Sequence, residues 1–236
     1  MTGSALNARL LSAAEFVRQN ATFADVGTDH AYLPLFLLES GRICYAVCSD
    51  INEGPLASAR RNAEERGRAG QMDFVLTDGA TILADRGITD YAICGMGGEL
   101  IADIIERAPH LRDEGVNLIL QPMTRQAHLR RYLAERGFEI LKESYSFDSG
   151  KYYVCILATF RGESRQLTDV EAELGMEIKD NANNSAQIGY INTKIAALTR
   201  AAEGKRLGGE SNITEEKIII AFKERLNAIS KEGKTK

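Results

Sequence analysis

Five apolar runs alternate with helix-like stretches over the first 160 residues, and this alternation constrains the fold more than any other feature. The runs expected to form strands are Thr22–Val26, Cys44–Cys48, Asp73–Leu76, Tyr91–Cys94 and Asn117–Gln121. The stretches expected to form helices are Leu33–Glu39, Pro55–Arg66, Ala80–Asp85, Leu100–Arg107 and Gln126–Arg136. Strands that alternate with helices require right-handed crossovers, which predicts an α/β fold with a mainly parallel sheet.

A β-hairpin is expected to close this sheet. Two β-prone runs, Phe138–Phe147 and Tyr152–Phe160, are joined by the turn-forming residues Asp148-Ser149-Gly150. Five β/α units and a hairpin make a Rossmann-like, seven-stranded sheet whose last strand is antiparallel. This arrangement resembles the sheet of class I methyltransferases, whereas a plain dinucleotide-binding domain does not normally end in this way.

The composition changes near Arg161, where apolar residues begin to recur at spacings of three and four. These spacings predict helices with one apolar stripe, which would form a small coiled-coil-like bundle of about three helices. We therefore expect two domains, residues 1–160 and residues 161–236. A further helix, Asn7–Arg18, precedes the first strand and is expected to pack on the sheet, leaving Arg9 and Arg18 available to solvent or RNA.

The loop after the first strand predicts a ligand site. Gly27 lets a ligand approach bare backbone at the carboxyl end of the strand, where open α/β sheets bind their ligands. The loop lacks the Gly-x-Gly-x-x-Gly pattern, and Asp25 would repel a pyrophosphate. A neutral or cationic nucleoside fits better, and S-adenosylmethionine (SAM) is the leading candidate. Thr28 and His30 belong to the same loop, although His30 is as well explained by a structural role.

Two further carboxylates end the second and third strands. Asp50 is placed to accept hydrogen bonds from ribose hydroxyls, and Asn52 follows it. Asp78 is placed to accept from the adenine amine, while Gly79 leaves room for the ring. Each Asp alone is equally well explained as a helix cap or turn former, so the prediction depends on all three together.

The fourth and fifth strands end at the same edge. Gly95, Met96 and Gly97 follow the fourth strand, where class I methyltransferases place the acceptor atom beside the donor methyl; a tight turn is the alternative. Gln121 and Pro122 end the fifth strand and are expected to contact substrate. The basic residues on the next helix predict phosphate contacts, with a solvated helix face as the alternative; those assigned to substrate are Arg125, Arg130 and Arg131.

These motifs resemble the bacterial tRNA (adenine-22-N1)-methyltransferase family over roughly residues 6–160. The strings that carry the resemblance are Ala24-Asp25-Val26-Gly27-Thr28-Asp29-His30-Ala31-Tyr32-Leu33-Pro34, Asn52-Glu53-Gly54-Pro55, Asp78-Gly79, Cys94-Gly95-Met96-Gly97-Gly98 and Leu118-Ile119-Leu120-Gln121-Pro122. The chain departs from the family at Met123, where Asn is frequent, and at Asp50, where Glu is frequent.

The resemblance implies methyl transfer from SAM to N1 of adenine 22 in tRNA. We expect Asp29 to stabilise the cationic product or take its N6 proton, and Tyr32 to stack on or hydrogen-bond to the base. The C-terminal helices would help to hold tRNA.

Composition sets the remaining expectations. The net charge is −4, with −5 over residues 1–160 and +1 over residues 161–236. No apolar run approaches the ~20 residues of a membrane span, and no secretory signal is visible, which favours a cytoplasmic protein. The four cysteines lie in apolar contexts and are expected to be buried thiols, without a metal. A monomer or weak homo-oligomer is expected.

Three alternatives stay open at this point. They are a methyltransferase for a small molecule or protein, a nicotinamide-dependent oxidoreductase, and a non-catalytic RNA-binding protein with a nucleotide-binding fold.

Overall fold

A seven-stranded mixed sheet forms the centre of the molecule in the computed structural model, which describes residues 6–176 and 184–232. Its strand order is β3-β2-β1-β4-β5-β7-β6. The strands are β1 (Ala21–Val26), β2 (Ile43–Asp50), β3 (Met72–Leu76), β4 (Asp90–Gly97), β5 (Asn117–Thr124), β6 (Phe138–Asp148) and β7 (Lys151–Phe160). β1 to β5 pair in parallel and β7 runs antiparallel to β5, which confirms the predicted sheet.

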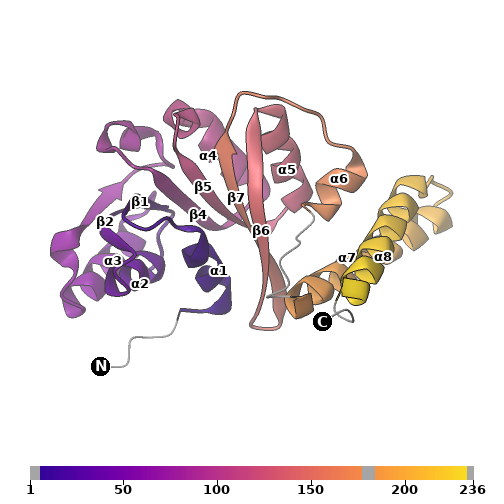
Figure 1. Cartoon of the computed structure of the whole chain (residues 1–236), viewed down its shortest axis with the longest axis horizontal. Helices are drawn as coiled ribbons and strands as arrows, with labels where there is room; N and C mark the ends of the chain where they lie inside the picture. The colour runs from indigo at the N-terminus through magenta and orange to yellow at the C-terminus, as the bar shows by residue number, and fades with distance from the viewer. Residues whose placement is uncertain (1–5, 177–183, 233–236) are drawn as a thin grey trace.

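Helices cover both faces of the sheet, giving three layers (Figure 1). One face carries α1 (Ala8–Phe16), α2 (Tyr32–Glu39) and α3 (Glu53–Glu65). The other carries α4 (Gly98–Arg107), α5 (Gln126–Glu135) and the short 3-10 helices η2 (Thr81–Arg86) and η3 (Pro109–Arg112), while η1 (Ala69–Gln71) leads into β3. Residues of a strand alternate between the faces. Phe23 therefore packs with the first set of helices, and Ala24 with the second.

Two local predictions differ from the structure. The segment Ala80–Asp85 forms the 3-10 helix η2 instead of an α-helix. The hairpin turn contains two residues instead of three, because Asp148 still pairs with Lys151. Ser149 and Gly150 both have positive φ, 48° and 79°, as a two-residue hairpin turn of the favoured twist requires.

Helix α1 is fastened to the amino end of the sheet. The backbone N–H and the guanidinium of Arg18 both donate to the buried carboxylate of Asp90, the first residue of β4. The guanidinium also donates to the carbonyls of Thr89 and Gly115 at 2.7 and 2.8 Å. Arg18 is therefore a structural residue, although its side chain is 44% exposed and so stays available to solvent, as expected; its contact with RNA stays a prediction.

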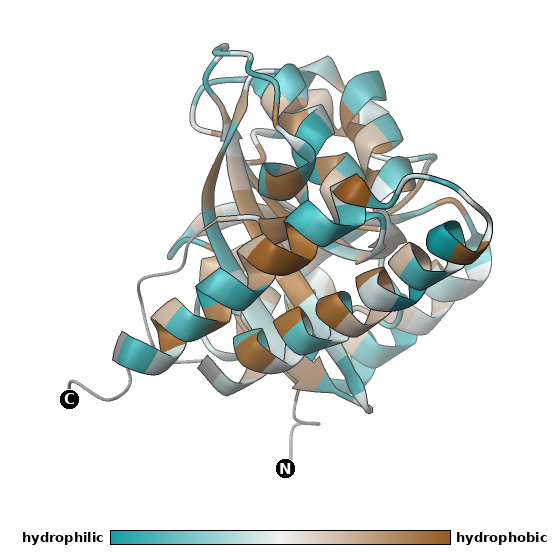
Figure 2. Cartoon of the chain, turned by 90° about the vertical axis from the view of Figure 1, so that its right-hand side faces the viewer, coloured by the Kyte–Doolittle hydropathy of each residue, from teal (hydrophilic) through white to brown (hydrophobic). Residues whose placement is uncertain are grey.

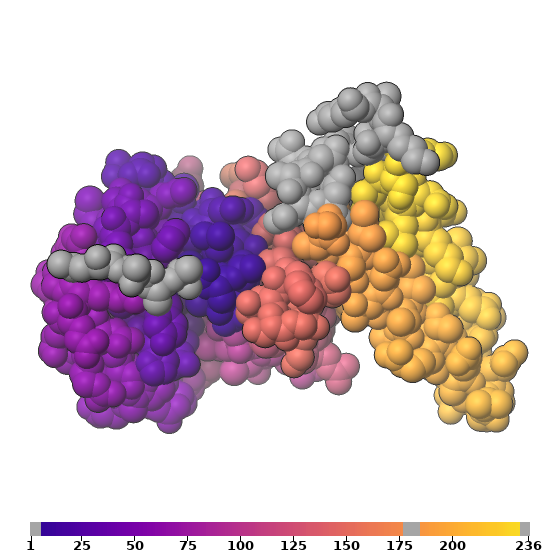
Figure 3. Space-filling model, turned by 90° about the horizontal axis from the view of Figure 1, so that it is seen from below, coloured from indigo at the N-terminus to yellow at the C-terminus, as the bar shows by residue number. Residues whose placement is uncertain are grey.

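The C-terminal part comprises α6 (Asp169–Leu174), α7 (Asn184–Leu207) and α8 (Ile213–Glu232). The last two lie side by side and project from the sheet (Figures 1 and 3). Apolar residues recur along both helices (Figure 2). The buried residues between the helices are Ile191, Ile218, Phe222 and Ile229. Gly189 lets α7 approach β7 closely, because a β-carbon there would lie 2.1 Å from the Tyr152 ring. The predicted helical position Ile178 lies outside the described residues.

Cys48 and Cys155 are buried and Cys94 is partly buried, but Cys44 is exposed on β2, against expectation. Cys44 and Tyr45 are the exposed residues of β2, between the buried Ile43 and Ala46. Within the described ranges, no helix is long and apolar enough to cross a membrane.

Candidate active site at the carboxyl edge of the sheet

The carboxyl ends of β1 and β4 lie side by side, and the connections from these strands leave in opposite directions along the sheet. Open α/β sheets form a crevice at such a point. Asp25, near the end of β1, is 7% exposed and accepts a hydrogen bond from Thr28 Oγ1 at 2.5 Å. Burial raises the pKa of Asp25 from 3.8 to about 6, although the Thr28 hydrogen bond and the Arg9 charge oppose the rise. The site thus holds a carboxylate that lacks a full set of partners and favours a cationic ligand.

The loop that follows Asp25 is strained. His30 and Ala31 have φ values of 60° and 55°, a left-handed conformation that is unfavourable for residues other than glycine. Asn62 Nδ2 holds this conformation by donating to the His30 carbonyl at 2.9 Å. Gly27 and Thr28 are held by hydrogen bonds from their backbone N–H groups to the Ser49 carbonyl, at 2.8 and 2.9 Å. Strain that the surroundings maintain in this way is typical of a functional loop.

The strained loop presents a polar and aromatic surface. The Asp29 side chain is 77% exposed, and His30 Nε2 lies 3.3 Å from its Oδ1. The His30 and Tyr32 rings are stacked, with centroids 5.3 Å apart and planes 21° apart. These three side chains together offer a carboxylate beside an aromatic face.

The predicted carboxylates of β2 and β3 lie along the same edge. Asp50 Oδ1 accepts a hydrogen bond from the backbone N–H of Asn52 at 2.7 Å, and this bond orients the Asp50 carboxylate. Asp78 is exposed and forms two hydrogen bonds with Arg107, at 2.5 and 3.1 Å. The Arg107 hydrogen bonds lower the pKa of Asp78, which keeps this carboxylate ionised. Gly79 follows with a φ of 75°, a conformation that glycine adopts readily, so the residue next to Asp78 has no side chain.

Glycines at the ends of β1 and β4 and at the start of α4 lie next to groups from other elements. A β-carbon on Gly27 would lie 1.9 Å from Met96 Cε, so the thioether covers the β1 turn. Gly95 has φ of 79°, and a β-carbon there would lie 3.5 Å from Arg9 Nη1. Gly98 begins α4, and a β-carbon there would lie 2.5 Å from the Arg125 carbonyl. Of these three positions, Gly98 is the one at which neighbouring backbone leaves no room for a side chain. The acceptor site predicted for this segment stays a prediction.

The predicted substrate residues near β5 separate into two groups. Arg125 is exposed, with φ of 56° and its Nε 3.4 Å from Glu99. Gln121 and Pro122, in contrast, are buried. Gln121 Oε1 accepts from the N–H of Gly95 at 3.2 Å and from Arg9 Nη1 at 2.7 Å. Contact between Gln121 and a substrate is therefore excluded without rearrangement, because its oxygen already has two donors.

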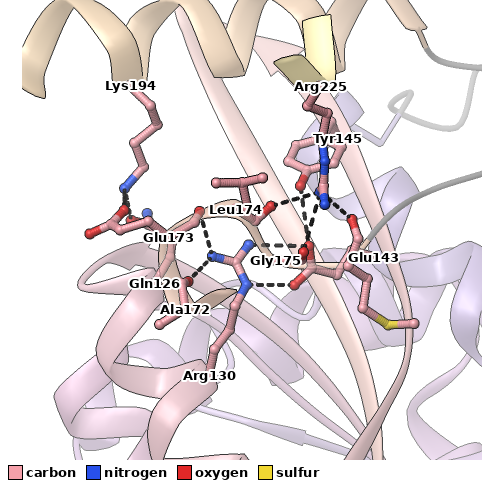
Figure 4. Close-up of polar contacts among 11 residues, drawn as sticks. Gln126, Arg130, Glu143, Tyr145, Ala172, Glu173, Leu174, Gly175, Lys194 and Arg225 are labelled. Atoms are coloured by element: carbon pink, nitrogen blue, oxygen red, sulfur yellow. Dashed lines mark hydrogen bonds and ion pairs between the residues drawn. The ribbon is translucent and has the colours of Figure 1, made fainter. Parts of the chain in front are cut away.

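The predicted phosphate contact by Arg130 was wrong. The Arg130 side chain is 1% exposed and pairs with the equally buried Glu143, with hydrogen bonds of 2.6 and 3.1 Å (Figure 4). It also donates to the Ala172 carbonyl at 2.9 Å. The neighbouring Arg131 is one-third exposed and pairs with Asp169 at 2.5 Å. Both arginines thus connect α5 to α6, and Arg130 serves the interior of the protein.

Sequence reasoning missed Arg9 as a residue of this edge. Its guanidinium reaches Gln121 across 112 positions of sequence, so no local motif connects the two. The available signal was the Asn7 side chain, which caps α1 by accepting from the N–H of Leu10 at 2.9 Å and thereby sets the helix start.

The complete edge has the chemistry of a nucleoside site. It offers carboxylates at the ends of β1, β2 and β3, a glycine turn against which a ligand can pack, and an exposed aromatic pair. The residues therefore fit a cationic nucleoside such as SAM better than a pyrophosphate, which requires several converging N–H groups.

Comparisons with known proteins agree with this geometry. A family model described as "Methyltransferase domain" matches residues 6–156. The tRNA (adenine(22)-N(1))-methyltransferase of Bacillus subtilis is 30% identical over 171 residues, which are 72% of each chain. A proposed tRNA (m1A22) methyltransferase of Streptococcus pneumoniae, solved in complex with S-adenosyl-L-methionine, is 31% identical with a TM-score of 0.79, covering 94% of this chain and 100% of the other. An M. capricolum relative solved with S-adenosyl-homocysteine is 28% identical with a TM-score of 0.71, covering 96% and 97%.

Proposed function

Because this chain belongs to the tRNA (adenine(22)-N(1))-methyltransferase family, we propose that it transfers a methyl group from SAM to N1 of adenine 22 in tRNA. The observation that carries the proposal is the strained loop 27–31, which places a buried carboxylate on one side and an exposed carboxylate with an aromatic pair on the other. One side suits the donor, and the other suits a base removed from its stack. tRNA as substrate implies a cytoplasmic enzyme, and a monomer or weak homo-oligomer stays our expectation.

The donor side is formed by the ends of β1 to β4. Asp25 accepts a hydrogen bond from the ammonium of the methionine moiety, Asp50 from the ribose hydroxyls and Asp78 from the adenine amine. The backbone and side chains that border them are Gly27, Thr28, His30, Asn52, Gly79, Gly95, Met96 and Gly97. SAM, when bound, supplies a methyl group on a positively charged sulfur, which makes that methyl electrophilic.

The acceptor side is formed by the exposed half of the loop. Tyr32 and His30 provide a surface on which an extruded adenine stacks, which offsets part of the few kcal/mol that unstacking costs. Methylation at N1 makes the adenine cationic. Asp29 stabilises that charge as a carboxylate or, alternatively, accepts the N6 proton, because its carboxylate is exposed at the same rim. The main contribution of the protein is the positioning of the two reactants.

The tRNA body has a separate set of candidate contacts. Arg125 lies exposed at the start of α5, close to the site. Arg200, Arg206, Lys217 and Lys223 are exposed on α7 and α8, where the net charge of the chain turns positive. These side chains suit phosphate contacts that are independent of sequence.

Nucleoside mass spectrometry tests the proposal. Unmodified tRNA is incubated with the protein and SAM, digested, and compared with a tRNA in which adenine 22 is replaced by guanine. We expect 1-methyladenosine from the first RNA and none from the second. Methylation at another position, or no methylated nucleoside in either RNA despite SAM binding, contradicts the proposed acceptor.

A further inference from the structure

The last carbonyls of α6 are held by two arginines from different parts of the chain. Arg130 of α5 donates to the carbonyls of Ala172 and Glu173, at 2.9 and 3.4 Å (Figure 4). Arg225 of α8 donates to the carbonyls of residues 174–176, at 3.2, 3.2 and 2.8 Å. These carbonyls have no partner within the helix, and arginine side chains satisfy them well. α6 therefore connects α5 with α8.

α6 packs more completely with the C-terminal helices than with the sheet. Its Val170 and Leu174 belong to the apolar cluster that α7 and α8 form. Between α6 and the sheet lies a cavity of about 780 Å³, which these two residues line together with Phe138 and Ile140 of β6. Apolar contact between α6 and β6 is therefore incomplete, so the hydrogen bonds of Arg130 carry much of the attachment.

Gly175 allows the end of α6 to approach the sheet at this point. It has a φ of 64°, and a β-carbon there would lie 2.7 Å from Cζ of Arg130. The backbone that leaves α6 thus lies directly against the buried pair of Arg130 and Glu143. The end of α6 is consequently fixed relative to the sheet.

The first turns of α7 form a second attachment of the α7–α8 hairpin. Ala186 and Tyr190 belong to the main core on the α4 and α5 face of the sheet. The Tyr190 ring packs against that of Tyr145 of β6, with centroids 4.9 Å apart. The rest of the hairpin projects beyond this base (Figure 1). A helix pair attached through one helix alone can swing about it, and the bonds of Arg225 on the α8 side oppose that motion.

We propose that Arg225 is a positioning residue for tRNA, because it fixes the direction of the α7–α8 hairpin by holding α8 against the end of α6. The inference rests on tRNA as the substrate in the proposed function. The basic side chains of the hairpin then stay at a constant distance from the acceptor side, where Arg125 caps α5. A tRNA bound by both parts does not have to order the hairpin when it binds, which favours binding.

Double electron–electron resonance tests the geometry without RNA. Nitroxide labels are attached at Glu64→Cys on α3 and Glu203→Cys on α7, both exposed, in a Cys44→Ser background that removes the exposed native thiol. We expect Arg225→Gln to broaden the distribution of label distances at least about twofold. Arg225→Lys keeps an N–H donor for the carbonyls and should broaden it less.

The matched control is Arg161→Gln. It removes the same charge from the lining of the same cavity, but the partner of Arg161 is Glu139 of β6, at 3.0 Å, and not α6. The distribution of label distances in this variant should therefore equal that of the wild type.

Steady-state kinetics with SAM and unmodified tRNA tests the consequence for the substrate. Arg225→Gln should raise the KM for tRNA at least about fivefold, while kcat at saturating tRNA and the affinity for SAM stay at the wild-type values. Arg161→Gln should leave all three quantities unchanged.

The two measurements together decide the role of Arg225. A higher KM with unchanged label distances overturns the proposal, because Arg225 would then contact tRNA directly. Broader distances with an unchanged KM, or no change in either, overturn it as well. If the wild type methylates no tRNA, the proposed function fails, and the distance measurement alone then decides whether Arg225 holds the hairpin.

Discussion

The buried ion pair between α5 and β6 permits a quantitative prediction. Arg130→Met keeps most of the side-chain volume but removes the guanidinium. Glu143, whose side chain is fully buried, then loses both hydrogen bonds from Arg130 and keeps the one from Tyr145 Oη at 3.1 Å. The α6 carbonyl of Ala172 loses its donor as well. The variant thus leaves a buried carboxylate without its counter-charge.

The size of the effect follows from burial. Removal of one partner of a buried pair costs about 3–5 kcal/mol of unfolding free energy, because the remaining charge is uncompensated. The combined variant Arg130→Met/Glu143→Leu removes both charges and should lie within about 1 kcal/mol of the wild type. Arg131→Met breaks a pair with Asp169 that is one-third to three-fifths exposed, and should cost about 0–1 kcal/mol.

Urea unfolding followed by circular dichroism measures these differences. The reasoning is refuted if Arg130→Met costs less than 1 kcal/mol, or if the combined variant is as unstable as the single one. A loss of tRNA affinity by Arg130→Met at unchanged stability would restore the surface role that the structure excludes.

Three further predictions concern the carboxylates of the site. Because burial raises the pKa of Asp25 from 3.8 to about 6, its ionisation destabilises the native state as pH rises from about 4 through 6. The unfolding free energy of Asp25→Asn should therefore exceed that of the wild type by up to about 3 kcal/mol at pH 8 and by nothing at pH 4. The variant should nevertheless bind SAM at least about tenfold more weakly by calorimetry. Equal stability gains at both pH values contradict the raised pKa of Asp25. Asp78→Ala should weaken SAM binding about fivefold or more, whereas Asp73→Ala, at the other end of β3, should not; equal affinities argue against the adenine contact. Asp29→Asn should lower kcat at least about tenfold at unchanged SAM affinity, with Glu39→Gln as the unaffected exposed control; a normal kcat removes Asp29 from the chemistry.

The central strands β1, β4 and β5 were predictable because each contains an apolar run that is buried on both faces. The antiparallel pairing of β6 with β7 followed from the terminal hairpin, since two β-prone runs with Ser149-Gly150 between them have few other solutions. The boundaries were less accurate where pairing continues past the apolar residues. β4 extends through Gly97 because its backbone still pairs with β5 as far as Thr124.

The basic stretch on α5 shows why composition alone was insufficient. Arg130 lies three and four residues from Ala127, Leu133 and Ala134, all buried, so the helical period places it on the inner face. Arg131 lies one position further round and is partly exposed. The period was visible in the sequence, but the presence of Glu143 to neutralise a buried arginine was not, because β6 is a separate element.

The strained loop was only half predictable. Gly27 indicated a turn, as glycine commonly does. The left-handed conformations of His30 and Ala31 carry no such signal, because neither residue prefers them. They exist because Asn62 of α3 holds the His30 carbonyl, a contact between elements that the sequence does not connect.

Helix α1 is held at one end, so a small rotation of the helix displaces its other end. The chain just after its last residue is fixed at Asp90, at the amino edge of the sheet, and Arg9 lies about 10.5 Å from Phe16 along the helix axis. A rotation of the helix by only ~5° about that fixed point moves Arg9 by ~1 Å, and a displacement of this size is enough to break a hydrogen bond. The hydrogen bond between Arg9 and Gln121 at the carboxyl edge therefore depends on packing at the amino edge, and a substitution around Asp90 would alter that bond from a full strand length away.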